Sequence, residues 1–316
     1  MDGSYMKKIC LFLGTISLFF VLSGCSFVLG READPVNVYK SYIDTQSENT
    51  DSQDTAEYIS STRTGSVFSI ASTYYLQQGG QRIKYVYYSS GIILNAEGYI
   101  LSVASSVAQI DGTSPSSTYA ILSSVYNDDT EYKITLVDSD ESSGLALFRF
   151  YDNFYYKDAK GDQQKGFQFI AEFSGKEVYT GDSCWAVGNS LGDIFDDANN
   201  LSITGGVIAQ STADEQLFAL SYNGVNYSYM IATAPVCPEM SGGALFDRNG
   251  YLIGMFASKI VSTDDSNSFV GGFEYLSKMA LFYKTDILID YVNHLSENLQ
   301  TVIPMTIAKI PAAAEV

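Results

Sequence analysis

The sequence predicts an all-β body closed by one C-terminal helix, and three observations support this prediction. Tyr and Gly are plentiful, with 24 and 26 among 316 residues, whereas there are only 6 Pro. Short runs rich in Val, Ile, Thr and Tyr alternate with Gly, Asn and Asp, a pattern typical of antiparallel strands joined by turns. Near the C-terminus this pattern gives way to apolar residues at helical spacing. The density of short strands indicates a sandwich or a barrel.

The N-terminal segment predicts export and lipidation. Lys7 and Lys8 precede an apolar run over residues 9–22, which has the length of a signal-peptide core and is too short to span a bilayer. The run ends in L-S-G-C at residues 22–25, which resembles the bacterial lipobox. We therefore expect residues 1–24 to be removed as a lipoprotein signal peptide and Cys25 to carry acyl chains, palmitate among them. The expected location is the extracytoplasmic face of a bacterial cell membrane, where two acyl chains give firm anchoring. The alternative is an uncleaved anchor with an incidental cysteine.

The segment over residues 25–64 is predicted to be a flexible acidic linker. It has few large apolar side chains and many Ser, Thr, Gln, Asp and Glu, so it cannot bury enough surface to offset the entropy lost on folding. Two sets of strands are predicted after it. The first set is Ser66–Ser72, Lys84–Leu94, Tyr99–Val103, Thr118–Tyr126, Glu131–Asp138 and Leu145–Phe150. The second set is Ser183–Val187, Leu201–Ala209, Leu217–Tyr222, Ser228–Ala232, Ala244–Asp247, Tyr251–Ala257 and Ser268–Tyr275.

The C-terminal helix is expected to follow Ser277, a suitable N-cap, and to reach about Asn298. Its apolar residues form one stripe that would face the strands. Residues 300–316 then make a short tail. The stripe consists of Ile287, Leu288, Tyr291, Val292, Leu295 and Leu299.

Composition and charge exclude several classes of protein. Hydrophobic residues make up 46% of the chain and charged residues 17%, too apolar for a disordered protein and too evenly dispersed for a polytopic membrane protein. The 18 Lys and Arg against 36 Asp and Glu give a net charge of −18, so the surface repels nucleic-acid phosphates. His294 is the only histidine, so any mechanism that needs an imidazole has to use it.

One motif carries a resemblance to a known family. Residues 238–245 read P-E-M-S-G-G-A-L, and residues 247–254 read D-R-N-G-Y-L-I-G. The first stretch resembles the nucleophile loop of chymotrypsin-fold serine proteases of the HtrA branch, which reads G-N-S-G-G-P/A-L. The second resembles the Asn-Gly turn and the V-I-G strand that follow this loop in the family. The resemblance puts Ser241 at the position of the nucleophile.

Three further blocks resemble the same family in the same order. Residues 90–101 are similar to its G-S-G-x-I-I-x-x-x-G-Y-I-L hairpin, and residues 131–147 to its Y-x-A-x-V-V-x-x-D and D-L-A-L-L segments. Residues 181–208 are similar to its G-D-x-V-x-A-I-G-N-P segment and the T-x-G-I-V strand that opens the second barrel. Altogether the resemblance covers roughly residues 65–298.

The resemblance implies an all-β fold with two antiparallel β-barrels of the chymotrypsin/trypsin-like fold and a C-terminal helix. Within a domain over residues 65–299, barrel 1 would span about 65–160, barrel 2 about 165–275 and the helix about 278–298. Family members commonly carry a C-terminal PDZ domain. The tail is too short for one, so no PDZ domain is expected.

The resemblance fails at three positions of the catalytic apparatus. Family chemistry needs a serine activated by a histidine, an aspartate that holds the imidazole, and backbone N–H groups that receive the oxyanion. Ser105 stands at the histidine position, Gly144 at the aspartate position, and Glu239 replaces the oxyanion-hole glycine. Glu239 disfavours a positive φ and adds negative charge beside a developing oxyanion. His294 cannot replace the base, because it falls in the predicted helix, which packs outside the second barrel in this family.

The sequence therefore predicts a catalytically inactive pseudoprotease, a membrane-anchored module that binds peptides or proteins at the bacterial cell envelope. Ser241 would be a vestigial nucleophile, retained because the loop needs small residues. The strand at about Leu252–Ala257 would offer its backbone to an extended peptide, which requires no triad. Two alternatives stay open: an active serine-type endopeptidase that uses Ser241 with a non-histidine base, and a structural envelope protein that binds no peptide.

Besides Cys25, processing would leave two cysteines. Cys184 and Cys237 are candidates for one disulfide in an oxidising envelope. If they stay free, Cys237 would be a reactive thiol only if its surroundings lowered its pKa. One His and two Cys cannot build a zinc site, and no Gly-rich phosphate loop follows a strand. We expect no metal and no cofactor; the expected partners are the membrane and an extended peptide or envelope protein.

Overall fold

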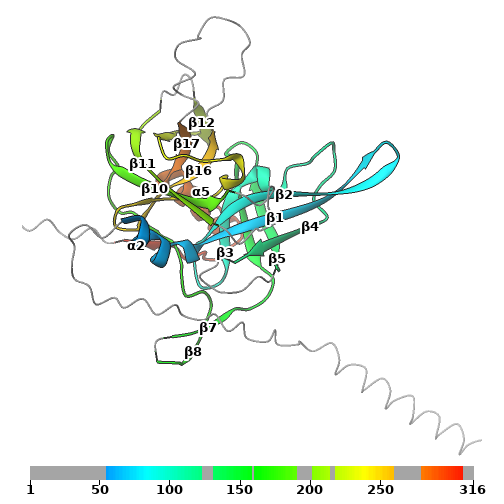
Figure 1. The fold of residues 1–316 in the computed structure, drawn as a ribbon, viewed down its shortest axis with the longest axis horizontal. Helices are drawn as coiled ribbons and strands as arrows, with labels where there is room; N and C mark the ends of the chain where they lie inside the picture. Colours follow the sequence, from blue (N-terminus) through cyan, green and yellow to red (C-terminus); the bar gives the residue numbers. More distant parts are fainter. Residues whose placement is uncertain are drawn as a thin grey trace, which may run out of the picture. The chain divides into compact units, whose positions relative to one another are not determined.

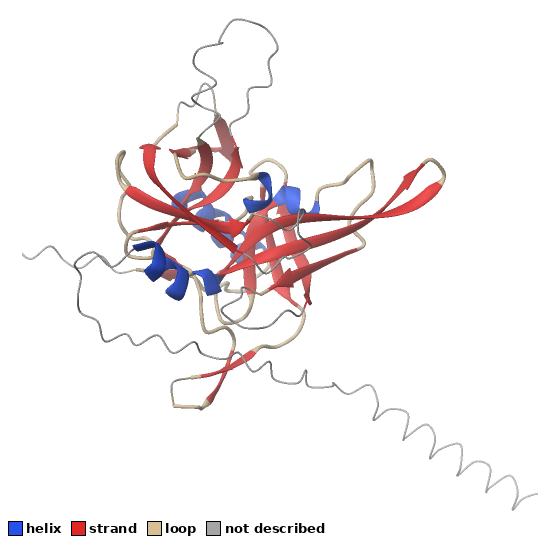
Figure 2. Ribbon diagram, in the orientation of Figure 1, coloured by secondary structure: helices blue, strands red, loops and turns tan. Residues whose placement is uncertain are grey.

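The computed structural model describes residues 55–122, 131–158, 160–190, 201–213, 218–259 and 279–308. Strands predominate among these residues, together with two α-helices, α2 (Thr55–Thr62) and α5 (Thr285–Asn298) (Figure 2). Cys25, the predicted signal peptide and most of the predicted linker lie outside the described residues. No helix within the described part of the chain is long and apolar enough to cross a membrane.

The first six strands close into an antiparallel barrel in the order β1-β2-β3-β6-β5-β4 (Figure 1). Aromatic side chains fill one end of it: the ring of Phe150 lies 5.7 Å from that of Phe68 and 4.6 Å from that of Phe154. The short 3-10 turn η3 (Ala104–Val107) follows the third strand. The strands are β1 (Val67–Gln78), β2 (Gln81–Ile93), β3 (Tyr99–Val103), β4 (Ser117–Ile121), β5 (Glu131–Asp140) and β6 (Leu145–Phe150).

A second antiparallel ring follows in the order β15-β10-β11-β14-β17-β16, and pairing between β15 and β16 closes it. Two short strands, β9 (Glu172–Phe173) and β18 (Thr306–Ile307), extend this sheet in parallel from β16. Two small hairpins lie outside the rings: β7 (Tyr155–Lys157) with β8 (Gln163–Lys165), and β12 (Ala219–Tyr222) with β13 (Val225–Ser228). The ring strands are β10 (Ser183–Asn189), β11 (Leu201–Gln210), β14 (Met230–Ala232), β15 (Ala244–Asp247), β16 (Leu252–Lys259) and β17 (Ala280–Lys284).

These two barrels and the C-terminal helix confirm the predicted fold class. One hydrophobic core joins them, because buried side chains of both barrels, such as Leu101 and Phe246, pack in one cluster with Tyr291 of α5. Residues 37–316 form one compact unit that contains both barrels and this core. The unit thus has the complete core that independent folding needs.

The predicted start of the C-terminal helix is wrong. Residues 280–284 form β17, which pairs with β14 and β16 and supplies the sixth strand of barrel 2. Because Ala280–Tyr283 are all buried, they show no alternation that would identify a strand. The helix begins at Thr285, and its stripe is buried as predicted except for Leu299, which is 45% exposed. Ser277 and the predicted strand Ser268–Tyr275 lie outside the described residues.

Two segments predicted to be linker or tail are ordered against the barrels. Part of the predicted linker forms α2, whose Ile59 is fully buried, and Arg63 just after it forms an ion pair with Glu172 at 3.4 Å. In the predicted tail, β18 pairs with β9, and Ile303 is 3% exposed. In each segment a single buried apolar side chain, Ile59 or Ile303, packs an otherwise polar stretch against the barrels. One such residue is too weak a signal to predict ordered structure from composition.

Candidate functional site

Ser241 lies in a tight turn where the two barrels meet. It directly follows the 3-10 turn η5 (Pro238–Met240) and precedes β15. The residue is only 7% exposed, and no other described side chain forms a hydrogen bond with its hydroxyl. Its carbonyl accepts a hydrogen bond of 2.8 Å from the N–H of Ser90 in β2. The nucleophile loop of barrel 2 is therefore fastened to barrel 1.

Two N–H groups of this turn, those of Met240 and Ser241, are engaged within the turn itself. The N–H of Ser241 donates to the carbonyl of Pro238 at 3.0 Å, and the N–H of Met240 donates to the carbonyl of Cys237 at 3.0 Å. Glu239 is not among the described residues with a positive φ, and its carbonyl accepts a hydrogen bond of 3.3 Å from Ser90 Oγ. An oxyanion hole needs N–H groups aimed at the reacting carbonyl. In this conformation the N–H of Ser241 serves the turn instead.

The two glycines after Ser241 are required by packing. Gly242 has φ +85°, and a Cβ there would lie 2.2 Å from the carbonyl oxygen of Ser90. A Cβ at Gly243 would lie 2.4 Å from the carbonyl oxygen of Val187. Backbone atoms cannot yield at these distances, so no larger residue fits. The two glycines of the Ser-Gly-Gly stretch thus have a structural reason that is independent of catalysis.

Ser105, at the predicted histidine position, lies in η3 with its side chain exposed to solvent. No other described side chain forms a hydrogen bond with its hydroxyl. Buried hydroxyls connect the turn to the nucleophile loop: Ser106 Oγ lies 2.9 Å from Ser102 Oγ, which donates to the carbonyl of Ser90 at 2.6 Å. Where an active protease has a histidine, this chain has the short side chain of Ser105. The neighbouring buried hydroxyls of Ser102 and Ser106 are hydrogen-bonded to each other and are not free to act on Ser241.

Gly144, at the predicted aspartate position, lies beside the same turn, because its carbonyl accepts a hydrogen bond of 2.8 Å from the N–H of Ala104. Its φ is +73°, and a Cβ there would lie 2.4 Å from the hydroxyl oxygen of Tyr283. Tyr283 comes from β17 of barrel 2 and is 5% exposed. Burial, together with a hydrogen bond to Tyr229, raises the pKa of Tyr283 far above its usual value. A neutral phenol therefore fills the space that an orienting carboxylate would need.

His294 lies on α5, and its partners belong to this helix and to β12, not to the loops that carry Ser105, Gly144 and Ser241. Its Nε2 is 2.9 Å from Asn298 Nδ2 on the next helical turn, and its ring meets Tyr222 edge-on at 5.9 Å. Within the described residues no hydrogen bond or ring contact joins it to Ser241 or to η3. The only imidazole of the chain thus packs between its own helix and the β12–β13 hairpin.

Both described cysteines are free thiols, so no disulfide joins Cys184 and Cys237 in this structure. Burial raises the pKa of Cys184 to about 12. Burial, and secondarily a hydrogen bond to the carboxylate of Glu239, raises the pKa of Cys237 to about 11. Because the thiolate is the nucleophile, neither cysteine is activated near neutral pH.

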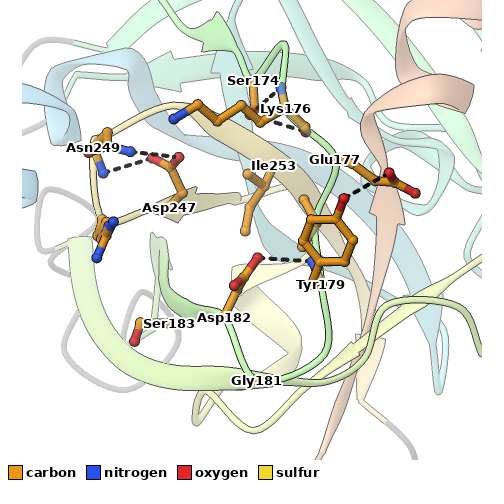
Figure 3. A pocket seen from close by; sticks show the side chains of 12 residues that line it. Ser174, Lys176, Glu177, Tyr179, Gly181, Asp182, Ser183, Asp247, Asn249 and Ile253 are labelled. Atoms are coloured by element: carbon orange, nitrogen blue, oxygen red, sulfur yellow. Dashed lines mark hydrogen bonds between the residues drawn. The ribbon is translucent and has the colours of Figure 1, made fainter. Parts of the chain in front are cut away.

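A pocket of about 410 Å³ opens on barrel 2, and its lining includes none of the predicted site residues (Figure 3). The segment over residues 174–183 and the turn at residues 247–249 line it, with Ile253 between them. Its carboxylates hold the local turns: Asp182 accepts the N–H of Tyr179 at 2.9 Å, and Asp247 accepts the N–H of Asn249 at 2.8 Å. In the described part of the chain, no group of three or more His, Cys, Asp or Glu could hold a metal ion.

The prediction that Leu252–Ala257 offers its backbone to an extended peptide is wrong for most of this segment, because its backbone already pairs with neighbouring strands. From Leu252 to Met255 the strand pairs with β15, and from Gly254 onwards it also pairs with β17. Phe256 exchanges hydrogen bonds with both glycines of the nucleophile loop. A bulge follows at Ala257, and the last two residues of β16 pair with β17 alone among the described strands. Among the described strands, β16 therefore has a neighbour on one side only from Ala257 onwards.

Comparison with known proteins identifies the family. The family model described as a trypsin-like peptidase domain matches residues 89–255, more than half of the chain, and this range includes Ser105, Gly144, Glu239 and Ser241. The chain belongs to the trypsin-like peptidase domain family. A search of curated proteins found no match.

The trypsin-like domain also resembles solved structures. Two structures of the HtrA-type protease AlgW with a decapeptide, one of them a serine-to-alanine variant, match with TM-scores of 0.55 and 0.56, the latter for the variant. Each is 20% identical; the matches cover 78% and 79% of this chain and 68% and 69% of the AlgW chains. At this identity the likeness establishes the shared fold, as the sequence motifs predicted.

Two residues that shape the site were not predicted from the sequence. Pro238 starts the 3-10 turn that engages the N–H of Ser241, and proline in the first position of a helical turn is a recognisable signal. Tyr283 fills the space beside Gly144, but it lies far along the chain on a strand that shows no alternation. Only tertiary structure brings Tyr283 to this trypsin-like site.

Proposed function

We propose that this trypsin-like domain is a pseudoprotease that binds extended polypeptide without cleaving it, held at the bacterial cell envelope by lipid on Cys25. The observation that carries the proposal is the turn at η5, in which the N–H of Ser241 donates to the carbonyl of Pro238 at 3.0 Å and so is not free for an oxyanion. Losing an oxyanion-hole donor costs about 10²–10³ in turnover, and losing the histidine costs on the order of 10⁶. Together these losses leave no useful rate of hydrolysis.

The binding half of the proposal rests on strand addition. The edge of β16 from Ala257 onwards pairs only with β17 among the described strands, so it can add an extended peptide through main-chain hydrogen bonds. AlgW, which shares the fold, has been solved with a decapeptide. Ser105 is exposed and has a smaller side chain than the histidine that the family places there.

The proposal is tested with fluorescein-labelled β-casein, an unstructured substrate, and residues 37–316. We expect casein to bind, measured as a rise in anisotropy, and to remain intact on a gel after prolonged incubation. Ser105→Trp should weaken binding at least about 10-fold, because a bulky indole at this exposed position would obstruct a polypeptide that passes over η3. Ser114→Trp, at an exposed position outside η3, is the matched control and should bind like the parent protein.

Two results would contradict the proposal. Casein cleavage that is lost in Ser241→Ala would establish an active endopeptidase with an unusual base. Absence of any anisotropy change with a folded sample would favour a structural envelope protein.

A further inference from the structure

The hairpin formed by β1 and β2 extends well beyond barrel 1 (Figure 1). β1 pairs with β4 only over Ser69–Thr73, and β2 pairs with β3 only at Ile92 and Ile93. From Tyr74 to Tyr85 the two strands pair only with each other among the described strands. The hairpin ends in Gly79-Gly80, both with positive φ, as a two-residue turn requires.

The base of this arm is fixed. Tyr74 is fully buried, and its hydroxyl donates to the carbonyl of Ala108 at 2.8 Å. Its ring lies 6.4 Å from that of Tyr85 across the hairpin. The buried Tyr74 therefore fixes the base of the arm to barrel 1.

The arm has two chemically different faces, because residues directly opposite in an antiparallel pair project to the same side. On one face Lys84 lies opposite Tyr75, and the guanidinium of Arg82 stacks 4.1 Å from the centre of the Tyr75 ring. On the other face Ile83 lies opposite Leu76. Tyr75 is 39% exposed beside the two cations, whereas Ile83 and Tyr85, each 41% exposed, present apolar and aromatic surface to solvent on the other face.

The charge of the arm is opposite to that of the protein. No Asp or Glu occurs between Glu57 and Glu97, and β1 and β2 carry Arg82 and Lys84. The hairpin therefore has a charge of +2 in a chain whose net charge is −18. An anionic surface would repel the body and attract this arm.

We propose that the β1–β2 arm is a docking element for anionic phospholipid headgroups. Tyrosine rings flanked by Lys and Arg suit the interface between headgroups and acyl chains, where the ring is partly buried and the cation meets phosphate. A few side chains suffice against a membrane, since each cation strengthens binding roughly fivefold.

The inference rests on the proposed membrane location, and its test separates the two. Residues 37–316 lack Cys25 and form the compact unit described above, so any vesicle binding is independent of lipidation. The probes are vesicles of phosphatidylcholine with one quarter phosphatidylglycerol, and vesicles of phosphatidylcholine alone. We expect co-sedimentation with the anionic vesicles at low salt, and little with the neutral vesicles or in 0.5 M salt.

Arm variants give the decisive comparison. Arg82→Glu/Lys84→Glu should weaken binding to anionic vesicles at least about 10-fold, and Ile83→Ser/Tyr85→Ser should weaken it as well. The matched control is Lys157→Glu/Lys165→Glu in the β7–β8 hairpin, which reverses two exposed lysines elsewhere and should leave binding unchanged. No binding to anionic vesicles, or equal losses in both charge-reversal variants, would overturn the inference. Thermal unfolding of each variant verifies that it is folded.

Discussion

Gly242→Ala is expected to destabilise the domain by about 4 kcal/mol or more. The residue has φ +85°, which costs a side chain about 1–2 kcal/mol, and the new Cβ would lie 2.2 Å from the carbonyl oxygen of Ser90. Neither atom can retreat easily, because Gly242 donates to Phe256 and Ser90 N–H donates to Ser241. Urea unfolding followed by Trp185 fluorescence measures the change in the free energy of unfolding.

Two control variants separate the causes of this loss. Gly80→Ala has a similar φ of +81° with nothing within 4 Å of its new Cβ, so it should cost only the backbone part, about 1–2 kcal/mol. Ser241→Ala removes a hydroxyl to which no other described side chain is hydrogen-bonded, so it should change stability by less than about 1 kcal/mol. If Gly242→Ala cost no more than Gly80→Ala, steric packing would not explain the Ser-Gly-Gly stretch.

Gly144→Ala is expected to cost about 3 kcal/mol, the second-largest effect. Its φ is +73°, and its Cβ would lie 2.4 Å from the hydroxyl oxygen of Tyr283. Gly112→Ala is an unusually close control, because Gly112 has the same φ of +73° and nothing within 4 Å of the new Cβ. The difference between the two free energies of unfolding measures the contact with Tyr283.

The same contact predicts a coupling that a double-mutant cycle can measure. In the Tyr283→Phe background the hydroxyl is gone, and the ring carbon Cζ lies 3.7 Å from the new Cβ, an ordinary contact. Gly144→Ala should therefore cost about 1–2 kcal/mol less in that background than in the parent. Independent, additive effects would contradict the account of this position. If the coupling is present, a carboxylate cannot be restored at position 144 without also changing barrel 2.

The sequence motifs predict the fold and much of the order of the strands. The predicted bounds of β3, β6 and β15 coincide with those of the structure, since each is a short, mainly apolar run that directly follows a glycine. The sixth strand of barrel 2, β17, was predicted to be helix because all four of its residues 280–283 are buried. Burial on both faces removes the alternation that distinguishes a strand from a helix.

The candidate site is only partly predictable from sequence. Local motifs indicate the places of Ser105, Gly144 and Ser241, and the structure brings their loops together through Ala104 and Ser90. The contact between the Tyr283 hydroxyl and Gly144 is not predictable in this way, because β17, which carries Tyr283, reaches the site only in the folded chain. The turn that engages the N–H of Ser241 depends on backbone geometry, which residue types suggest through Pro238 but do not determine.

Fluorophosphonate labelling will show whether Ser241 is activated, because the probe reacts with an activated serine and requires no knowledge of a substrate. Residues 37–316 are incubated with the probe beside the Ser241→Ala variant and an active serine protease, and intact mass is recorded. With no imidazole contacting Ser241 and its N–H engaged by Pro238, we predict no adduct on a folded sample. A stoichiometric adduct that Ser241→Ala abolishes would show that another base activates this serine, and would contradict the account.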